Sequence, residues 1–129
     1  MLPTIHQPDL KDEVLTPEGC WILESWNDPS DKAVSIARAR VTPGVTTQWH
    51  RLRGVDERYA IIAGSGLMRT GTLAPTRVGP GDIVVVPAGV PQQITNDGNT
   101  DLIFYCICTP RFTPGCYESL EGTNRERAE

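Results

Sequence analysis

Short runs of alternating or continuously hydrophobic residues fill most of the chain, and clusters of Gly, Pro, Asn and Asp separate them. Runs of this length between such clusters are typical of β-strands, because the clustered residues favour turns. The most hydrophobic run is 83–86, and it lies between turn clusters at 79–82 and 87–91. The runs that predict strands are 20–26, 33–41, 46–53, 57–63, 67–70, 72–78, 83–86, 92–96 and 101–108.

About eight to ten short, regularly spaced strands predict an all-β sandwich or barrel. The 12 Gly and 11 Pro residues agree with a fold that has many turns. We interpret Asn96-Asp97-Gly98 as a hairpin turn. A chain of 129 residues is long enough for one domain with its own core.

We expect one domain over residues 1–129, with the barrel core at about 33–108. Residues 1–32 supply an arm and added strands, and 1–17 are expected to lie on the domain without forming a helix. Residues 109–129 form a C-terminal extension, in which 123–129 are expected to be a frayed charged tail.

The net charge of −4 and the pI near 5.1 argue against a nucleic-acid surface or a polybasic membrane patch, because both need concentrated positive charge. No apolar run approaches the ~20 residues that cross a bilayer, and the first residues lack the pattern of a signal peptide. We therefore expect a soluble cytoplasmic protein that binds neither nucleic acid nor membranes.

The four cysteines include no C-x-x-C pair, so the sequence indicates neither a zinc ribbon nor a thioredoxin-like motif. In a reducing compartment we expect free thiols. Cys106 and Cys108 are two residues apart in a predicted strand and share a face. Two interpretations stay open for this pair: small buried hydrophobic residues, or thiolates that complete a soft metal site.

His50 is one of two histidines, and Glu57 follows it after a Gly-containing turn. Strand-like runs enter and leave this stretch, so the imidazole and the carboxylate are expected to face each other across a hairpin. Such a pair is a candidate acid/base couple. The plainer alternative is a buried imidazole that is hydrogen-bonded to Glu57 and only fills the barrel mouth.

Two spaced motifs in the chain resemble those of the cupin superfamily, which are small jelly-roll β-barrels. In the first motif five residues separate Gly44 from His50, Leu52 stands where a second histidine is usual, and Glu57 and Gly64 follow at the family spacing. The second motif has glycines, prolines and an asparagine at the family positions, with Gln in place of His: Gly81, Pro87, Gly89, Gln92 and Asn96.

The resemblance implies a divalent metal inside the barrel, which many cupins hold with three histidines and a glutamate. Carried over to this chain, the ligand positions are His50, Leu52, Glu57 and Gln92, and Leu52 has no donor atom. The metal ligands would then be His50, Glu57 and Gln92. Gln48 shares the strand face of His50 by period 2 and would be a further oxygen donor. This ligand set would bind a divalent metal weakly or not at all. The candidate ions are Fe, Mn, Ni and Zn, and the oxygen donors favour the harder ions among them.

Other roles are open for the same residues. Gln92 would otherwise hydrogen-bond a ligand or Glu57. Tyr59, two residues after Glu57, supplies a phenol to the pocket or belongs to the core. His50 and Glu57 are the candidate catalytic residues, and Gln48, Tyr59 and Gln92 the candidate ligand-binding residues.

Two functions follow from the resemblance. One is an atypical metal-dependent enzyme of the dioxygenase, isomerase or lyase type that acts on a small polar metabolite. The other is a metal-free ligand-binding or sensing barrel. Cupins often pair, so we also expect a homodimer, with Trp21 and Trp26 of the first strand as a candidate contact surface.

Overall fold

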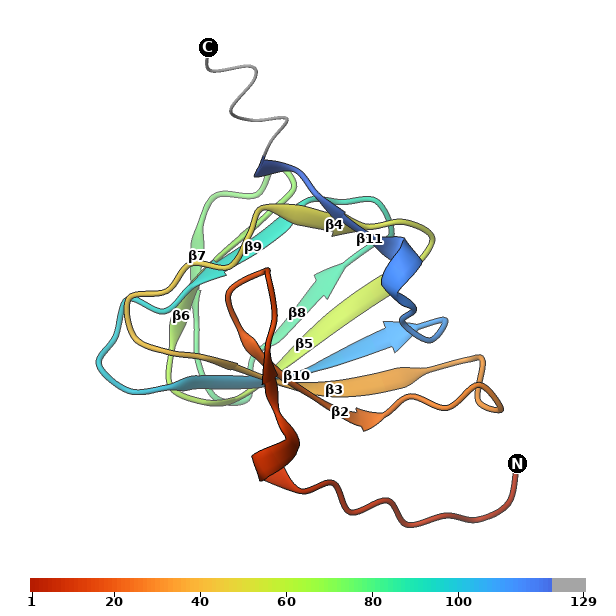
Figure 1. Cartoon of the computed structure of the whole chain (residues 1–129). Helices are drawn as coiled ribbons and strands as arrows, with labels where there is room; N and C mark the ends of the chain where they lie inside the picture. The colour runs from red at the N-terminus through yellow and green to blue at the C-terminus, as the bar shows by residue number, and fades with distance from the viewer. Residues whose placement is uncertain (122–129) are drawn as a thin grey trace.

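The computed structural model describes residues 1–121, which form two antiparallel β-sheets that face each other as a barrel (Figure 1). One sheet has the order β1 (Val14–Leu15), β2 (Trp21–Trp26), β3 (Ser35–Val41), β10 (Leu102–Thr109), β5 (Asp56–Ala63), β8 (Ile83–Val86). The other has the order β11 (Tyr117–Ser119), β4 (His50–Leu52), β9 (Gln92–Thr95), β6 (Gly66–Thr70), β7 (Thr76–Val78). Two single 3₁₀ turns complete it, η1 (Leu10–Asp12) and η2 (Pro114–Cys116). The prediction of an all-β cupin-type barrel is confirmed.

The core lies between the sheets, where inward positions alternate with outward ones. On β8, Val84 and Val86 are buried whereas Ile83 and Val85 are exposed. The fully buried side chains Val41, Ile94 and Leu102 come from both sheets. This period-2 burial is what the hydrophobic runs predicted.

The turn between β5 and β6 carries the chain from one sheet to the other and admits only glycine at its first position. Gly64 has φ +74°, and a Cβ built there would lie 2.4 Å from the carbonyl oxygen of Asp101. A side chain would therefore meet both backbone strain and a collision. The motif glycine is explained by this close crossing.

Two hairpin predictions are wrong. β4 and β5 belong to different sheets, so His50 and Glu57 are not hairpin partners but approach across the barrel interior. β9 and β10 also belong to different sheets. The loop after β9 is instead organised by the fully buried Asn96, whose amide donates to the carbonyls of Val41 and Thr100, each at 2.8 Å.

The predicted strand at 46–53 is mostly irregular, since only His50–Leu52 is paired as a strand. The reason is that Thr47 and Gln48 hydrogen-bond in other ways. The Thr47 hydroxyl accepts from the Ile94 amide at 3.0 Å, and the Gln48 amide donates to the Glu18 carbonyl at 2.9 Å. The run at 72–78 likewise shortens to β7.

The flanks contain the strands β1, β2 and β11. Residues 1–17, which were expected to form an arm without a helix, contain β1 and the short 3₁₀ turn η1. The turn between β1 and β2 rises into the space between the two sheets (Figure 1). The predicted charged tail at 123–129 lies outside the described residues.

Candidate functional site

A cavity of about 540 Å³ lies inside the barrel, at the side that the N-terminal segment covers. Its volume falls in the range of small-molecule pockets, roughly 300–1,000 Å³. Most of its lining is apolar, from residues such as Ile22, Ala39, Leu52 and Phe104. Its acidic and imidazole groups are those of Asp12, Glu18, Glu24, Glu57, His6 and His50.

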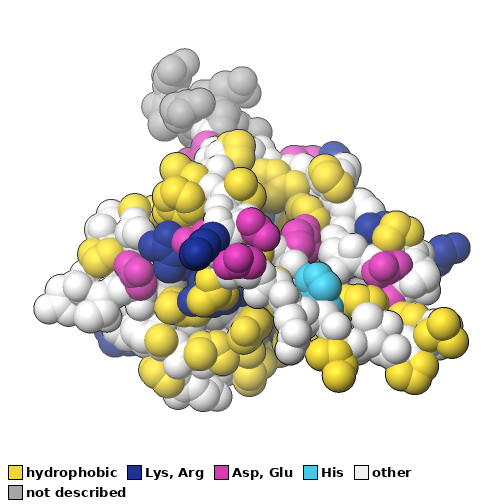
Figure 2. All heavy atoms as spheres, turned by 60° about the horizontal axis from the view of Figure 1, so that its bottom comes forward, with side chains coloured by type: hydrophobic (Ala, Val, Ile, Leu, Met, Phe, Trp, Pro, Cys, Tyr) yellow, Lys and Arg dark blue, Asp and Glu magenta, His cyan; other side chains and the backbone are white. Residues whose placement is uncertain are grey.

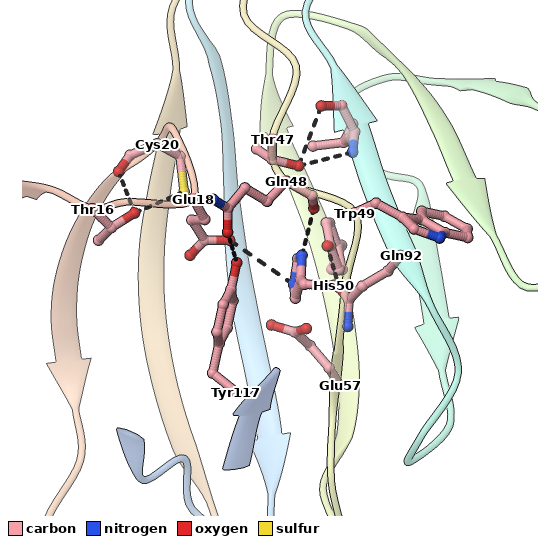
Figure 3. Close-up of polar contacts among 12 residues, drawn as sticks. Thr16, Glu18, Cys20, Thr47, Gln48, Trp49, His50, Glu57, Gln92 and Tyr117 are labelled. Carbon is pink, nitrogen blue, oxygen red and sulfur yellow. Dashed lines mark hydrogen bonds and ion pairs between the residues drawn. The ribbon is translucent and has the colours of Figure 1, made fainter. Parts of the chain in front are cut away.

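His50 is the first residue of β4, where its backbone pairs with Gln92 on one side and Ser119 on the other. Its ring Nδ1 donates to the carbonyl oxygen of Gln48 at 2.7 Å, since a carbonyl can only accept. In the neutral tautomer that has this bond, Nε2 carries no proton and can accept. The ring stacks on Tyr117 with centroids 4.8 Å apart, which fixes its plane (Figure 3).

Glu57 enters the cavity from β5 in the opposite sheet, and 8% of it is exposed. Within residues 1–121 its Oε1 has no hydrogen-bond partner, and Oε2 has only the Cys108 thiol at 3.9 Å. Burial raises the pKa of this carboxyl, and the nearby Gln92 amide and the Cys106 and Cys108 thiols oppose that rise only in part. Glu57 thus holds a buried carboxylate oxygen without a hydrogen-bond partner in residues 1–121, on a residue that lines the cavity.

The hydrogen bond expected between His50 and Glu57 does not form among the described residues. The imidazole instead uses the Gln48 carbonyl, and its Nε2 lies 3.9 Å from Oε2 of Glu18. Figure 3 shows the Glu57 carboxylate and the His50 ring beside the same space without a bond between them. The two groups therefore border the same space without being bonded to each other.

Tyr59 and Gln92 are joined to each other. The Tyr59 hydroxyl donates to Oε1 of Gln92, and both side chains are buried. Tyr59 lines the cavity and its ring stacks on Phe104 with centroids 4.7 Å apart, so it belongs to both the pocket and the core. Gln92 is not among the described residues that line the cavity.

Gln48 does not occupy the position that period 2 predicted. Because β4 begins only at His50, the strand alternation does not extend back to residue 48, and Thr47 lines the cavity in its place. The Gln48 side-chain oxygen accepts from the Tyr117 hydroxyl at 2.8 Å. Gln48 therefore positions Tyr117, which in turn supports His50.

Glu18 is a site residue that the sequence did not indicate. It lies in the turn between β1 and β2, which is closed by the Thr16 hydroxyl donating to the Cys20 carbonyl at 2.9 Å and by Gly19 at φ +99°. Burial raises the pKa of Glu18, the charge of His50 lowers it, and the charge of Glu57 raises it further. The run Thr16-Pro17-Glu18-Gly19 carries a turn signal, with Pro second and Gly fourth. No local feature of the sequence, however, predicts that this turn lies over the barrel.

Tyr117 is the other residue missed. It opens β11, a three-residue strand that pairs with β4 at Leu52. Only the return of the C-terminal extension to this edge brings its ring against His50.

Three of the four cysteines, Cys20, Cys106 and Cys108, line the cavity as free thiols. Burial raises the pKa of all three, and the charge of Glu57 raises each of them further. They are protonated near neutral pH, so they contribute apolar surface and weak donors. The soft metal site is not supported.

The residues present do not fit the metal that the resemblance implies. Leu52 is buried in a hydrophobic cluster with Val55, Cys108 and Cys116. The carbonyl oxygen of Gln92 already accepts from Tyr59. In the part of the chain that the structure describes, no three His, Cys, Asp or Glu side chains are placed to hold one ion. A stable centre with divalent transition metals usually needs at least three such donors at bonding distance.

None of the helices in residues 1–121 has the length and apolar character of a membrane span.

Comparison with known proteins agrees with the fold. The model of the cupin domain matches residues 37–108. An uncharacterized protein of Methanocaldococcus jannaschii, MJ1618, is 32% identical over 109 residues, which cover 83% of this chain and 86% of that protein. An oxalate-binding protein of Thermotoga maritima is 33% identical over 78 residues, which cover 60% of this chain and 63% of that protein.

Among solved structures, protein SO0799 of Shewanella oneidensis superposes with a TM-score of 0.78 at 20% identity, covering 92% of this chain and 84% of that one. This likeness concerns the fold alone. The family model spans more than half of the residues and agrees with the motif spacing and the two-sheet barrel, so the chain belongs to the cupin family.

Proposed function

We propose that this cupin binds a small polar organic molecule directly through side chains of the barrel, without a metal ion between protein and ligand. The observation that carries the proposal is Oε1 of Glu57, a buried oxygen of a cavity-lining residue that has no partner among the described residues. A buried polar atom without a partner costs about 1–3 kcal/mol, and a bound donor would remove that cost.

The other groups around the cavity support the same role. His50 offers an acceptor at Nε2, and Glu18 offers a half-buried carboxylate 3.9 Å from it. The apolar and aromatic lining supplies the surface that such pockets bury against a ligand. A few convergent polar groups in a mostly apolar cavity are typical of small-molecule sites.

A second candidate is metal-free acid/base catalysis. Glu57 and His50 enter from opposite sheets, one with a raised pKa and the other with a free ring nitrogen. Such a pair can give a proton to one atom of a ligand and take one from another, which is the chemistry of isomerisation. The metal-dependent dioxygenase or lyase is the less supported alternative, because the donor set is incomplete.

Oxalate, the ligand in the name of the Thermotoga maritima relative, is not the ligand that we propose here. Bound directly, a dianion would lie against Glu57 and Glu18, and only the imidazoles of His6 and His50 could offset its charge among the lining side chains of residues 1–121.

The test is a screen of small polar fragments by protein-observed NMR, with EDTA in every sample. We expect hits that shift the amides of β4, β5 and β10 around the cavity, and that weaken in Glu57→Gln. The matched control is Asp97→Asn, which changes an exposed carboxylate paired with Arg77. Hits that appear only after a divalent metal replaces EDTA, or that map away from these strands, would overturn the proposal.

A further inference from the structure

The charged side chains that line the cavity are mostly acidic. Four carboxylates line it, whereas no Lys or Arg of the described residues does. Several arginines are paired with acids outside the cavity, as in Arg77 with Asp97 at 2.7 Å and Arg53 with Glu118 at 2.6 Å. Glu57 and Glu18 lack such partners within residues 1–121, because Oε1 of Glu57 has none and the contact of Glu18 is with the imidazole of His50 at 3.9 Å. These two carboxylates of the cavity therefore have no Lys or Arg partner within residues 1–121.

Aromatic side chains line the same cavity as these carboxylates. Tyr59 stacks on Phe104, and Tyr117 stacks on His50, with Phe112 also lining the cavity. The face of an aromatic ring attracts a cation within about 6 Å of its centroid, more strongly when water is excluded. Carboxylates and ring faces around one apolar space are the usual elements of an organic-cation site.

The distances between the donor atoms of the cavity favour an organic cation over a metal ion as the ligand. An ion needs several donors at about 2.0–2.6 Å from one point, and residues 1–121 do not supply that arrangement. An ammonium group has N–H donors that reach carboxylate oxygens at about 2.7–2.9 Å, and its carbon skeleton can fill apolar volume. A cavity of about 540 Å³ has room for such a skeleton.

We propose that the pocket selects small organic cations of the ammonium class over neutral and anionic molecules of the same size, through Glu57, Glu18 and the surrounding aromatic rings. This proposal rests on the binding function proposed above and adds the class of ligand. Glu57 supplies the buried carboxylate oxygen, Glu18 closes the site from the turn between β1 and β2, and the rings contact the rest of the molecule.

The test compares three ligands of one shape: phenethylamine, phenethyl alcohol and hydrocinnamate, titrated by protein-observed NMR at neutral pH with EDTA. We expect the amine to bind about tenfold more tightly than the alcohol, the ratio that one charge-assisted hydrogen bond gives. Hydrocinnamate should bind most weakly. Glu57→Gln and Glu18→Gln should each reduce the amine affinity about tenfold and leave the alcohol within about twofold. The charge-matched control Asp97→Asn should leave all three unchanged.

The possible outcomes distinguish a failure of cation selection from a failure of the proposed binding function. If hydrocinnamate binds as tightly as the amine, or if the amine preference survives in the Glu18→Gln, Glu57→Gln double variant, cation selection is wrong while pocket binding stands. If none of the three ligands shifts the amides around the cavity, both proposals fail. Circular dichroism melts of each variant check that a lost affinity does not come from unfolding.

Discussion

Glu57 is the residue on which the account of the site depends. It is a carboxylate in a mostly apolar cavity, with its Oε1 unpartnered in the described part of the chain. Evolution rarely keeps such a group for stability, because burying a charge without a partner costs free energy. A bound ligand is the simplest reason for it to be there.

Replacement of Glu57 by Gln should stabilise the free protein at neutral pH by on the order of 1 kcal/mol. Burial raises the folded-state pKa above the ordinary value of 4.5, so the folded protein holds the proton more tightly than the unfolded chain does. Stability therefore falls as pH rises from 4.5 through the folded pKa, and then stays level. The unfolding free energy of Glu57→Gln should therefore fall less than that of the wild type over this pH range.

Urea unfolding across this pH range measures the difference between the two proteins. Glu18 also has a raised pKa and contributes a fall in the same direction, but it is present in both. A variant that is less stable than the wild type by the same amount at every pH would contradict the account of Glu57.

The pair of Tyr59 and Gln92 should contribute to stability as well. Tyr59→Phe removes the donor to the Gln92 side-chain oxygen and leaves a buried acceptor unsatisfied, at an expected cost of about 1–3 kcal/mol. Tyr105→Phe, on the partly exposed face of β10, is the matched control and should stay within about 0.5 kcal/mol. Equal effects of the two substitutions on urea unfolding would show that the Tyr59 bond is not used.

At the scale of elements, the turn between β1 and β2 carries Glu18 into the barrel. Gly19 in this turn has φ +99°, a conformation that a side chain disfavours. Gly19→Ala should cost about 1 kcal/mol in unfolding free energy and weaken phenethylamine binding, because Glu18 would be displaced. The control is Gly115→Ala, where an added Cβ meets no atom within 4 Å. Unchanged amine affinity in Gly19→Ala would show that the turn does not position Glu18.

The elements also show which parts of the site a sequence can reveal. The spacing of Gly44, His50, Glu57 and Gly64 predicted the barrel and brought His50 and Glu57 into one cavity. The same spacing could not show that the two strands belong to opposite sheets. Whether a turn pairs its strands or crosses between sheets depends on contacts such as that of Gly64 with the Asp101 backbone.

Glu18 and Tyr117 could not be predicted for a related reason. Both reach the site from flanks outside the motif, and both are placed by bonds to residue 48 that span long stretches of sequence. Gln48 was predicted as an inward donor by strand alternation. Its backbone instead leaves the ladder to bond the Glu18 carbonyl, and local periodicity carries no signal of that.

For the whole molecule, we propose a homodimer that forms through the N-terminal arm and β1. The side chains of Trp21 and Trp26 are only partly available for a dimer contact. Arg40 stacks over Trp21, and the Trp26 indole donates to Asp31 at 2.9 Å. Exposed apolar side chains are more numerous on the arm, including Ile5, Val14 and Leu15. Figure 2 shows hydrophobic side chains around a charged centre on the face that is turned forward there.

Light scattering at micromolar concentration should give twice the mass of one chain. Val14→Lys places a charge on this exposed patch and should shift the protein toward the monomer, whereas Leu73→Lys, at an exposed position in the loop before β7, should not. A wild-type protein that is already monomeric would remove the proposal.

The central claim is that the barrel contacts its ligand directly and not through a metal. Elemental analysis tests this best, on protein incubated without air with Fe²⁺, Mn²⁺, Ni²⁺ or Zn²⁺ and then dialysed. We predict well below one ion per chain, with His50→Ala indistinguishable from the wild type. One ion per chain in the wild type that is lost in His50→Ala would contradict the claim, because His50 would then be holding a metal.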